Sequence, residues 1–184
     1  MPASTTLSAT EIAHLKTLHE LLSTLPQTGY VEWIGVRPAR REAMVAVQSV
    51  EALVDSGLRG DRYASSGKRQ VTLIQAEHLR VLEQLLAKPV EPAMLRRNVV
   101  VSGINVIALK GARFRVGEAL LVGTGPCEPC SRMEEALGPG GYNAMRGHGG
   151  ITARIVEPGR INVGDAITFE DLESDGQQTD GRAG

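Results

Sequence analysis

Short apolar runs separated by glycines dominate the second half of the chain. Beyond residue 98 the runs cover 99–101, 106–109, 114–116, 119–122, 151–156 and 166–169, with Gly103, Gly111, Gly117, Gly159 and Gly164 between them. Short strands repeated at intervals of about 8–12 residues are typical of a β-barrel or sandwich and not of a doubly wound sheet. Apolar runs at 31–36, 44–50 and 71–74 add further strands. We therefore expect a mainly β, or α+β, fold: a β-barrel with flanking helices.

Three segments have apolar residues at helical spacing. Residues 76–87 carry a leucine stripe that ends before Pro89, and residues 131–137 are long enough for one or two turns. Ser8 and Glu11 form a capping box, which predicts a helix from there to about residue 25. On these assignments His78 lies on the polar side of a helix, and His148, between glycines, lies in an exposed loop.

The pattern divides the chain into three parts. Residues 1–28 form an N-terminal extension with one helix, residues 29–170 form the domain, and residues 171–184 form an acidic tail. The tail is almost free of apolar residues, so we expect it to be disordered. A length of 184 residues agrees with one domain.

Composition and charge exclude several classes of protein. The formal net charge is −1; because residues 170–184 hold five acids and one base, the remaining chain carries only +3. That charge is too small for the basic face of a nucleic-acid-binding protein, and aromatic residues make up only 3%. No run approaches the ~18 apolar residues of a transmembrane helix. The N-terminus also lacks the pattern of a secretory signal, so we expect a cytoplasmic location.

The only two cysteines, Cys127 and Cys130, form a Cys-x-x-Cys motif between a predicted strand and a predicted helix. The start of a helix and the neighbouring Arg132 would both stabilise a thiolate. Four interpretations remain open: incidental thiols, a thioredoxin-like dithiol, a zinc site, or a single cysteine that ligates a larger cofactor such as a molybdenum centre. The βαβ context of a thioredoxin motif is missing, and the pair supplies two of the four ligands of structural zinc.

Other polar segments offer donors for an anion. Residues 95–98 place two arginines and an asparagine before a strand, and residues 60–62 and 68–70 add charged side chains on loops. The basic residues are 16 Arg and only 4 Lys, and Arg suits bidentate recognition of phosphate or carboxylate. Glycines at 138–141 and 147–150 could cradle an anion or simply form turns.

Taken in order, these segments resemble the MOSC domain, named for the C-terminus of molybdenum-cofactor sulfurases. The resemblance spans roughly residues 29–170 and is carried by the segments 57–62, 69–74, 95–101, 129–133, 149–154 and 164–165. It implies a MOSC-type β-barrel with flanking helices. Many relatives have His where this chain has Tyr63.

The resemblance also implies a site. Cys130, followed by Arg132, matches the family's characteristic cysteine, which ligates molybdenum of the pterin cofactor in reductases and is thought to carry sulfur in sulfurases. Arg96 and Asn98 match residues that help to hold the pterin phosphate and dithiolene end. Ser131 and Arg132, with Arg69 from the 68–70 segment, are further expected cofactor contacts.

The function expected from this resemblance is binding of molybdenum cofactor through Cys130. The protein would then reduce N-oxygenated compounds with an external electron-transfer partner, or transfer sulfur received from a cysteine desulfurase. The alternatives are a metal-free persulfide carrier and a non-catalytic binding domain.

Overall fold

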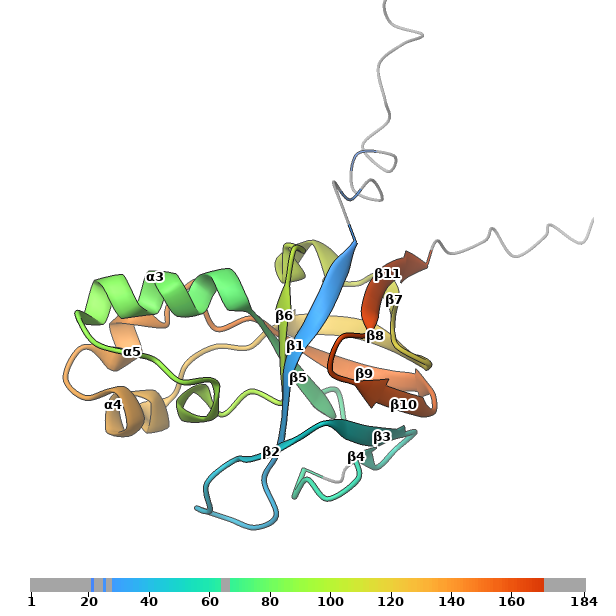
Figure 1. Ribbon diagram of the computed structural model, residues 1–184, viewed down its shortest axis with the longest axis horizontal. Coiled ribbons are helices and arrows are strands. Elements are labelled where there is room, and N and C mark those ends of the chain that lie inside the picture. The colour runs from blue at the N-terminus through green and yellow to red at the C-terminus, as the bar shows by residue number, and fades with distance from the viewer. Residues whose placement is uncertain (1–20, 22–24, 26–27, 64–66, 171–184) are drawn as a thin grey trace, which may run out of the picture.

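The computed structural model describes residues 21, 25, 28–63 and 67–170 (Figure 1). The predicted helix at 8–25 and the tail at 171–184 fall outside these residues, apart from Leu21 and Leu25. The strands are β1 (Gly29–Val36), β2 (Val45–Val47), β3 (Ser49–Leu53), β4 (Gly57–Leu58), β5 (Val71–Gln75), β6 (Val99–Ser102), β7 (Arg113–Val116), β8 (Ala119–Pro126), β9 (Ile151–Glu157), β10 (Gly159–Asn162) and β11 (Ala166–Glu170). The helices are α3 (Ala76–Leu86), α4 (Ser131–Leu137) and α5 (Gly141–Ala144), with 3₁₀ turns η1 (Pro92–Leu95) and η2 (Val106–Leu109).

Seven strands close into a barrel in the order β11-β7-β8-β9-β5-β6-β1. The closing contact joins the first and last strands through the pairs Gly29↔Ile167 and Tyr30↔Ala166. Neighbouring strands in the barrel are antiparallel except β5 and β6, which are parallel and connected through α3 and η1. β2 extends the sheet beside β1, and β10, β3 and β4 form a separate three-stranded sheet. The predicted β-barrel with flanking helices is confirmed.

The barrel interior is filled by alternating apolar side chains. On β9, Ile151, Ala153 and Ile155 are buried while the residues between them are more exposed, which is the two-residue period of a strand. These side chains pack with Phe114 of β7 and Ile167 of β11 in the larger of two hydrophobic clusters. The barrel is therefore a packed core and a rigid support for the loops at its ends.

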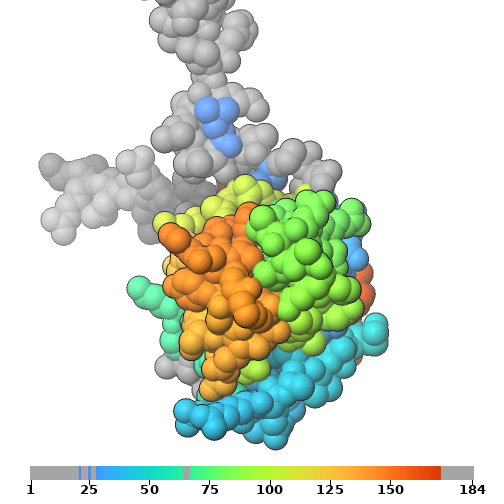
Figure 2. Space-filling view, turned by 90° about the vertical axis from the view of Figure 1, so that its left-hand side faces the viewer, coloured from blue at the N-terminus to red at the C-terminus, as the bar shows by residue number. Residues whose placement is uncertain are grey.

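A second apolar cluster fixes the helices to one side of the barrel. Ile74 and Val100 point outward from β5 and β6 and pack against Leu82 of α3, and Met133 and Leu137 of α4 join them. The leucine stripe predicted for 76–87 is the side of α3 that faces this cluster. Figure 2 shows α3 and the segment 131–150 side by side on this face, with the chain between β1 and β2 below them.

Two predictions at the level of elements are wrong. The run 106–109 is the 3₁₀ turn η2 and not a strand, because the Asn105 side chain accepts a hydrogen bond from the Ile107 amide and starts a helical turn. His78 and His148 are not separate solvated side chains: their rings contact each other edge to face, with centroids 4.9 Å apart. Within the described ranges, no helix is long and apolar enough to cross a membrane.

Candidate functional site

A pocket of about 530 Å³ opens at the side of the barrel where β1 and β8 end and β6 begins. Its wall is strongly basic, because eight of the sixteen lining residues that the structure describes are arginines and Glu128 is the only acid among these sixteen. The lining residues are Arg37, Arg40, Arg41, Arg62, Tyr63, Arg69, Thr72, Arg96, Arg97, Asn98, Pro126, Glu128, Pro129, Cys130, Arg132 and Met133. Such a wall is suited to an anionic ligand.

Cys130 lies on an extended segment that leaves the barrel after β8. β8 loses regular register with β9 between Gly123 and Gly125, and Pro126 and Pro129 cannot donate ladder hydrogen bonds. Burial alternates along this segment: Cys127 and Pro129 are buried, whereas Glu128 and Cys130 are exposed. Cys130 has extended backbone angles and forms the N-cap of α4. Its thiol is therefore presented to the pocket, and Cys127 faces the interior.

Cys127 is buried and is fixed by hydrogen bonds to its side chain and its backbone. Its side chain is 1% exposed, and its sulfur accepts a hydrogen bond of 2.9 Å from Nη2 of Arg69. Its amide donates to the Gly150 carbonyl at 2.8 Å. Because successive side chains of an extended segment point to opposite faces, the two sulfurs do not face each other. Both cysteines are free thiols, and the geometry does not support the dithiol interpretation.

Arg97 lies beneath this segment as a buried cation. Its guanidinium donates to three backbone carbonyls, those of Leu95, Cys127 and Gly149, at 2.7–3.0 Å. Burial is the main cause that lowers the pKa of Arg97; the Cys127 sulfur opposes this shift, Arg69 adds to it and Cys130 opposes it. Arg97 therefore fixes the backbone on which Cys127 and Cys130 lie, and its charge acts on both thiols.

The side chain of Asn98 is fully used inside the fold. Oδ1 accepts from the amide and hydroxyl of Thr72, and Nδ2 donates to the Gly35 carbonyl and to Asp61. An Asn side chain has two donors and two acceptor sites, so these four bonds leave it none for a ligand. Asn98 lines the pocket, but its contacts are those of a residue that ties β1, β5 and β6 together, and not of the cofactor contact expected from the resemblance.

Arg37 offers an unused donor. It is 5% exposed, yet its Nε has no hydrogen-bond partner among the described residues. Its amide donates to Asp61, and its guanidinium lies 4.6 Å from the ring centre of Tyr63, which Arg62 also contacts at 4.7 Å. Burial and then the charge of Arg96 lower the pKa of Arg37, and Asp61 partly offsets this. A buried donor of this kind is costly unless a ligand accepts from it.

Two pocket arginines have backbone conformations that are rare for residues with a side chain. Arg41 has φ +72° and Arg96 has φ +56°, and they are two of four such non-glycine residues in the described part of the chain. The left-handed region costs roughly 1–2 kcal/mol per residue. In each case the fold tolerates this strain at a residue that lines the pocket.

The structure brings together five of the six residues predicted for the site. Arg69, Arg96, Asn98, Cys130 and Arg132 line the pocket, whereas Ser131, the first residue of α4, lies outside its lining. Arg132 also pairs with Glu135 at 2.7 Å, so part of its charge is compensated.

The sequence did not single out Arg37, Arg40 and Arg41 as lining arginines, whereas Arg62 and Arg97 belong to the segments expected to offer donors for an anion. The excess of Arg over Lys was the available signal, but it does not say which arginines meet in space. Among the described residues, no group of three or more His, Cys, Asp and Glu could hold a metal ion without an external ligand.

Comparisons with known proteins give a family and a fold. The family model for the MOSC domain matches residues 59–168. The structure is similar to the YuaD protein from Bacillus subtilis, with a TM-score of 0.67 and 19% identity, covering 78% of this chain and 97% of that chain. It is also similar to YiiM from Geobacillus stearothermophilus, with a TM-score of 0.64 and 18% identity, covering 78% of this chain and 75% of that chain. The match to YiiM from Escherichia coli has a TM-score of 0.63 and 21% identity, and covers 82% of this chain and 73% of that chain. Among curated proteins, none matches the sequence at a significant level.

Proposed function

The chain belongs to the MOSC domain family, and from this premise we propose that it binds molybdenum cofactor, with the thiolate of Cys130 as the protein ligand of the metal. The observation that carries the proposal is the exposed free thiol of Cys130 in a pocket lined by eight arginines. The proposed activity is reduction of N-oxygenated compounds, with electrons from a separate electron-transfer partner in the cytoplasm.

The residues present fit this cofactor. A pterin cofactor carries a phosphate, and the guanidiniums of Arg37, Arg62 and Arg96, which line the pocket, supply donors for an oxyanion. Thiolate sulfur is a soft ligand, the type that suits a soft or highly oxidised metal centre. The Asn98 amide, with its bonds to Thr72 and Asp61, would set the shape of the pocket floor instead of contacting the cofactor.

The remaining residues of the site would position Cys130. Arg97 fixes the carbonyl of Cys127, and the amide of Cys127 is fixed by Gly150, so the segment up to Cys130 has little freedom to move. Arg69 donates to the Cys127 sulfur and Arg97 lies beneath the segment, so positive charge lies close to the sulfur atoms. When bound, the molybdenum centre would supply the two electrons that accompany removal of an oxygen atom from the substrate.

Elemental and pterin analysis tests the proposal. Protein purified from a host that makes molybdenum cofactor should carry close to one molybdenum per chain, Cys130→Ser should lose the metal, and Cys127→Ser is the matched control that should keep it. Melting curves of both variants establish that each is folded. Wild-type protein without metal or pterin, indistinguishable from Cys130→Ser, would overturn the proposal.

The exposed Cys130 thiol also supports a second candidate, a metal-free sulfur carrier that receives sulfur from a cysteine desulfurase. Incubation with a desulfurase and cysteine should then add ~32 Da to Cys130, the mass of one persulfide sulfur, detected by mass spectrometry. Absence of the adduct, under conditions that load a known acceptor, would remove this candidate. A non-catalytic domain would behave identically with and without Cys130 in both experiments.

A further inference from the structure

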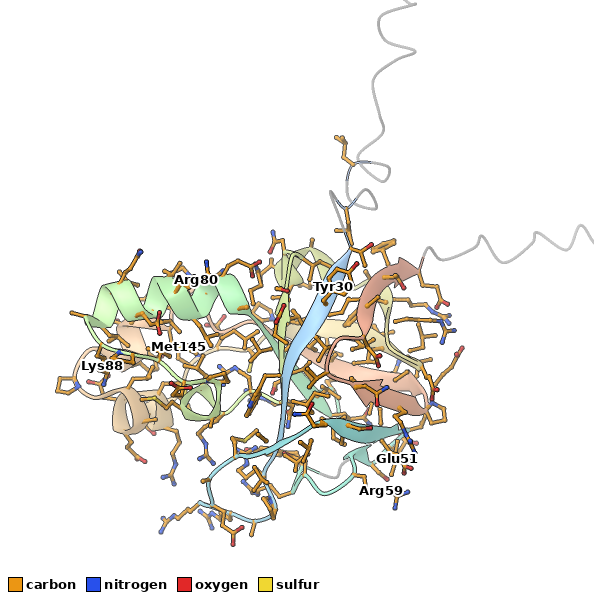
Figure 3. The ribbon with its side chains drawn as sticks, in the orientation of Figure 1. Tyr30, Glu51, Arg59, Arg80, Lys88 and Met145 are labelled. Carbon is orange, nitrogen blue, oxygen red and sulfur yellow. The ribbon has the colours of Figure 1, made fainter. Side chains whose placement is uncertain are left out.

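Arg40 and Arg41 form an exposed part of the pocket wall on the chain between β1 and β2. Throughout the described ranges, neither guanidinium has a hydrogen bond or an ion pair. Arg59, in the turn directly after β4, is different, because Glu51 accepts from its Nε at 2.6 Å (Figure 3). The two pocket arginines are thus held beside the site without a protein counter-charge, and Arg41 is held there in a left-handed conformation.

A count of the pocket's charges shows an excess that one phosphate does not balance. Arg132 pairs with Glu135, whereas Arg97, Arg69 and Arg96 donate to backbone carbonyls or to the Cys127 sulfur. Bonds to carbonyls cancel no charge, and the described lining offers one carboxylate, that of Glu128. A phosphate monoester carries about −1.5 to −2 at neutral pH. Several positive charges therefore remain, two of them on the exposed Arg40 and Arg41.

We propose that Arg40 and Arg41 form a second anion subsite at the rim of the pocket, which selects a co-substrate bearing a carboxylate or phosphate group. This inference rests on the proposed function, since it names the class of small molecule that approaches Cys130. Exposed guanidiniums bind planar oxyanions through paired N–H donors, and the recess behind them, lined by Tyr63 and Met133, can hold the uncharged part of the molecule.

The concave shape favours a small molecule over an acidic protein as the ligand. Arg40 and Arg41 line a pocket of about 530 Å³ together with Tyr63 and Met133, and do not lie on a flat face. A protein surface could contact Arg40 and Arg41 but would leave the recess behind them empty. The rim arginines and the recess together therefore point to one small anion with an uncharged body.

The test compares three small ligands that are not reduced: benzoate, phenyl phosphate and the neutral benzamide. Their binding to the full chain is measured by ligand-observed NMR at low ionic strength, on metal-loaded and on metal-free protein. The test variant is Arg40→Gln/Arg41→Gln. The matched control is Arg80→Gln/Arg154→Gln, which removes two exposed, unpaired arginines of the described chain from α3 and β9, outside the pocket (Arg80 is labelled in Figure 3).

We expect metal-loaded wild-type protein to bind each anion about tenfold more tightly than benzamide, and this preference should decrease as salt is added. The preference should vanish in Arg40→Gln/Arg41→Gln and persist in the control. Benzoate and phenyl phosphate distinguish a carboxylate from a phosphate as the better group.

Equal affinities of wild-type protein for the anions and benzamide would overturn the subsite. So would an anion preference that survives in Arg40→Gln/Arg41→Gln. If Arg40→Gln/Arg41→Gln keeps the anion preference but the metal-loaded variant is reduced more slowly by an acidic electron-transfer protein, the rim is a protein-docking surface and the proposal is wrong. Failure of the proposed function is seen separately, as absence of molybdenum and pterin. The metal-free arm then tests the rim through the loss of anion affinity in Arg40→Gln/Arg41→Gln relative to the control.

Discussion

Arg69 donates a hydrogen bond to the sulfur of Cys127 at 2.9 Å, joining two residues that are 58 positions apart in the chain. Arg69 lies two residues before β5, and Cys127 directly after β8, so this contact exists only when the barrel has formed. It assigns the two cysteines to different tasks. Cys127 belongs to the interior wall of the site, and Cys130 is the sulfur that a ligand can reach.

The two thiols should therefore differ in reactivity. In native protein a thiol reagent should modify Cys130 rapidly, and Cys127 at least a hundredfold more slowly, because about 3 kcal/mol of local opening must precede its reaction. Stopped-flow labelling with Cys127→Ser and Cys130→Ser assigns the phases. Mild oxidation should not join the two cysteines within one chain, and rapid formation of such a disulfide would contradict the opposite orientation of the sulfurs.

Gly149 should be essential for the position of the cysteine segment. A Cβ at this residue would lie 2.1 Å from the Cys127 carbonyl oxygen, so Gly149→Ala must displace that carbonyl and its bond to Arg97. We expect a loss of about 3 kcal/mol in the free energy of unfolding and faster labelling of Cys127.

Gly147→Ala is the control for this substitution. Gly147 has φ +78° and open space around it, so alanine should cost roughly 1–2 kcal/mol without changing the labelling of Cys127. Urea unfolding and thiol labelling measure both effects. Equal labelling in the two variants would show that Gly149 does not control the cysteine segment.

Asn98→Ala should destabilise the barrel strongly. The substitution removes four hydrogen bonds, leaves the Thr72 amide without its partner in a buried site and takes one of three donors from the Asp61 carboxylate, at a cost of about 3 kcal/mol. Asn105→Ala, at the exposed start of η2, removes one hydrogen bond and should cost about 1 kcal/mol. Urea unfolding compares the two, and similar losses would mean that the buried network adds little.

Acid should weaken the domain through His78. Burial, and then the charge of His148, lowers the pKa of His78 below its usual value of 6.5, although the backbone of His148 and the Glu77 carboxylate partly oppose this. The unfolded chain therefore takes up this proton first. The stability that His78 contributes is complete above about pH 6.5 and is lost as the pH falls through the lower, folded-state pKa.

Urea midpoints between about pH 8 and pH 5 measure this effect. The decrease toward acid should be smaller in His78→Gln than in the wild type, since glutamine does not take up the proton. His148→Gln should reduce the decrease less, because the burial of His78 remains. Parallel profiles for His78→Gln and the wild type would assign the acid sensitivity to other groups.

The periodic elements could be predicted from sequence, and the contacts between distant ones could not. The stripe of α3 and the apolar runs of the barrel strands carry their own period, so residues 76–86 and the strand-rich second half were predicted correctly. Four apolar residues at 106–109 are too few to show whether the period is that of a strand or a helix. The side chain of Asn105 caps this segment and favours a helical turn.

The sequence predicted only those site residues that belong to recognisable motifs. Segments 95–98 and 129–133 identified Arg96, Asn98 and Cys130 through resemblance, and the fold brings all three to one pocket. No local pattern predicts that Arg37 and Arg62 meet over Tyr63, or that His78 meets His148, because barrel closure and helix packing create those contacts. For the same reason, the internal use of the Asn98 amide became visible only in the structure.

The two residue pairs that join β1 to β11 also determine when the domain can be completed. β1 is synthesised first among the barrel strands and β11 last, so a nascent chain keeps an open edge on β1 until residues 166–170 have left the ribosome. Residues 166–170 must therefore be synthesised before the open edge of β1 pairs with another chain. A chain truncated before residue 166 forms a sheet that cannot close into a barrel.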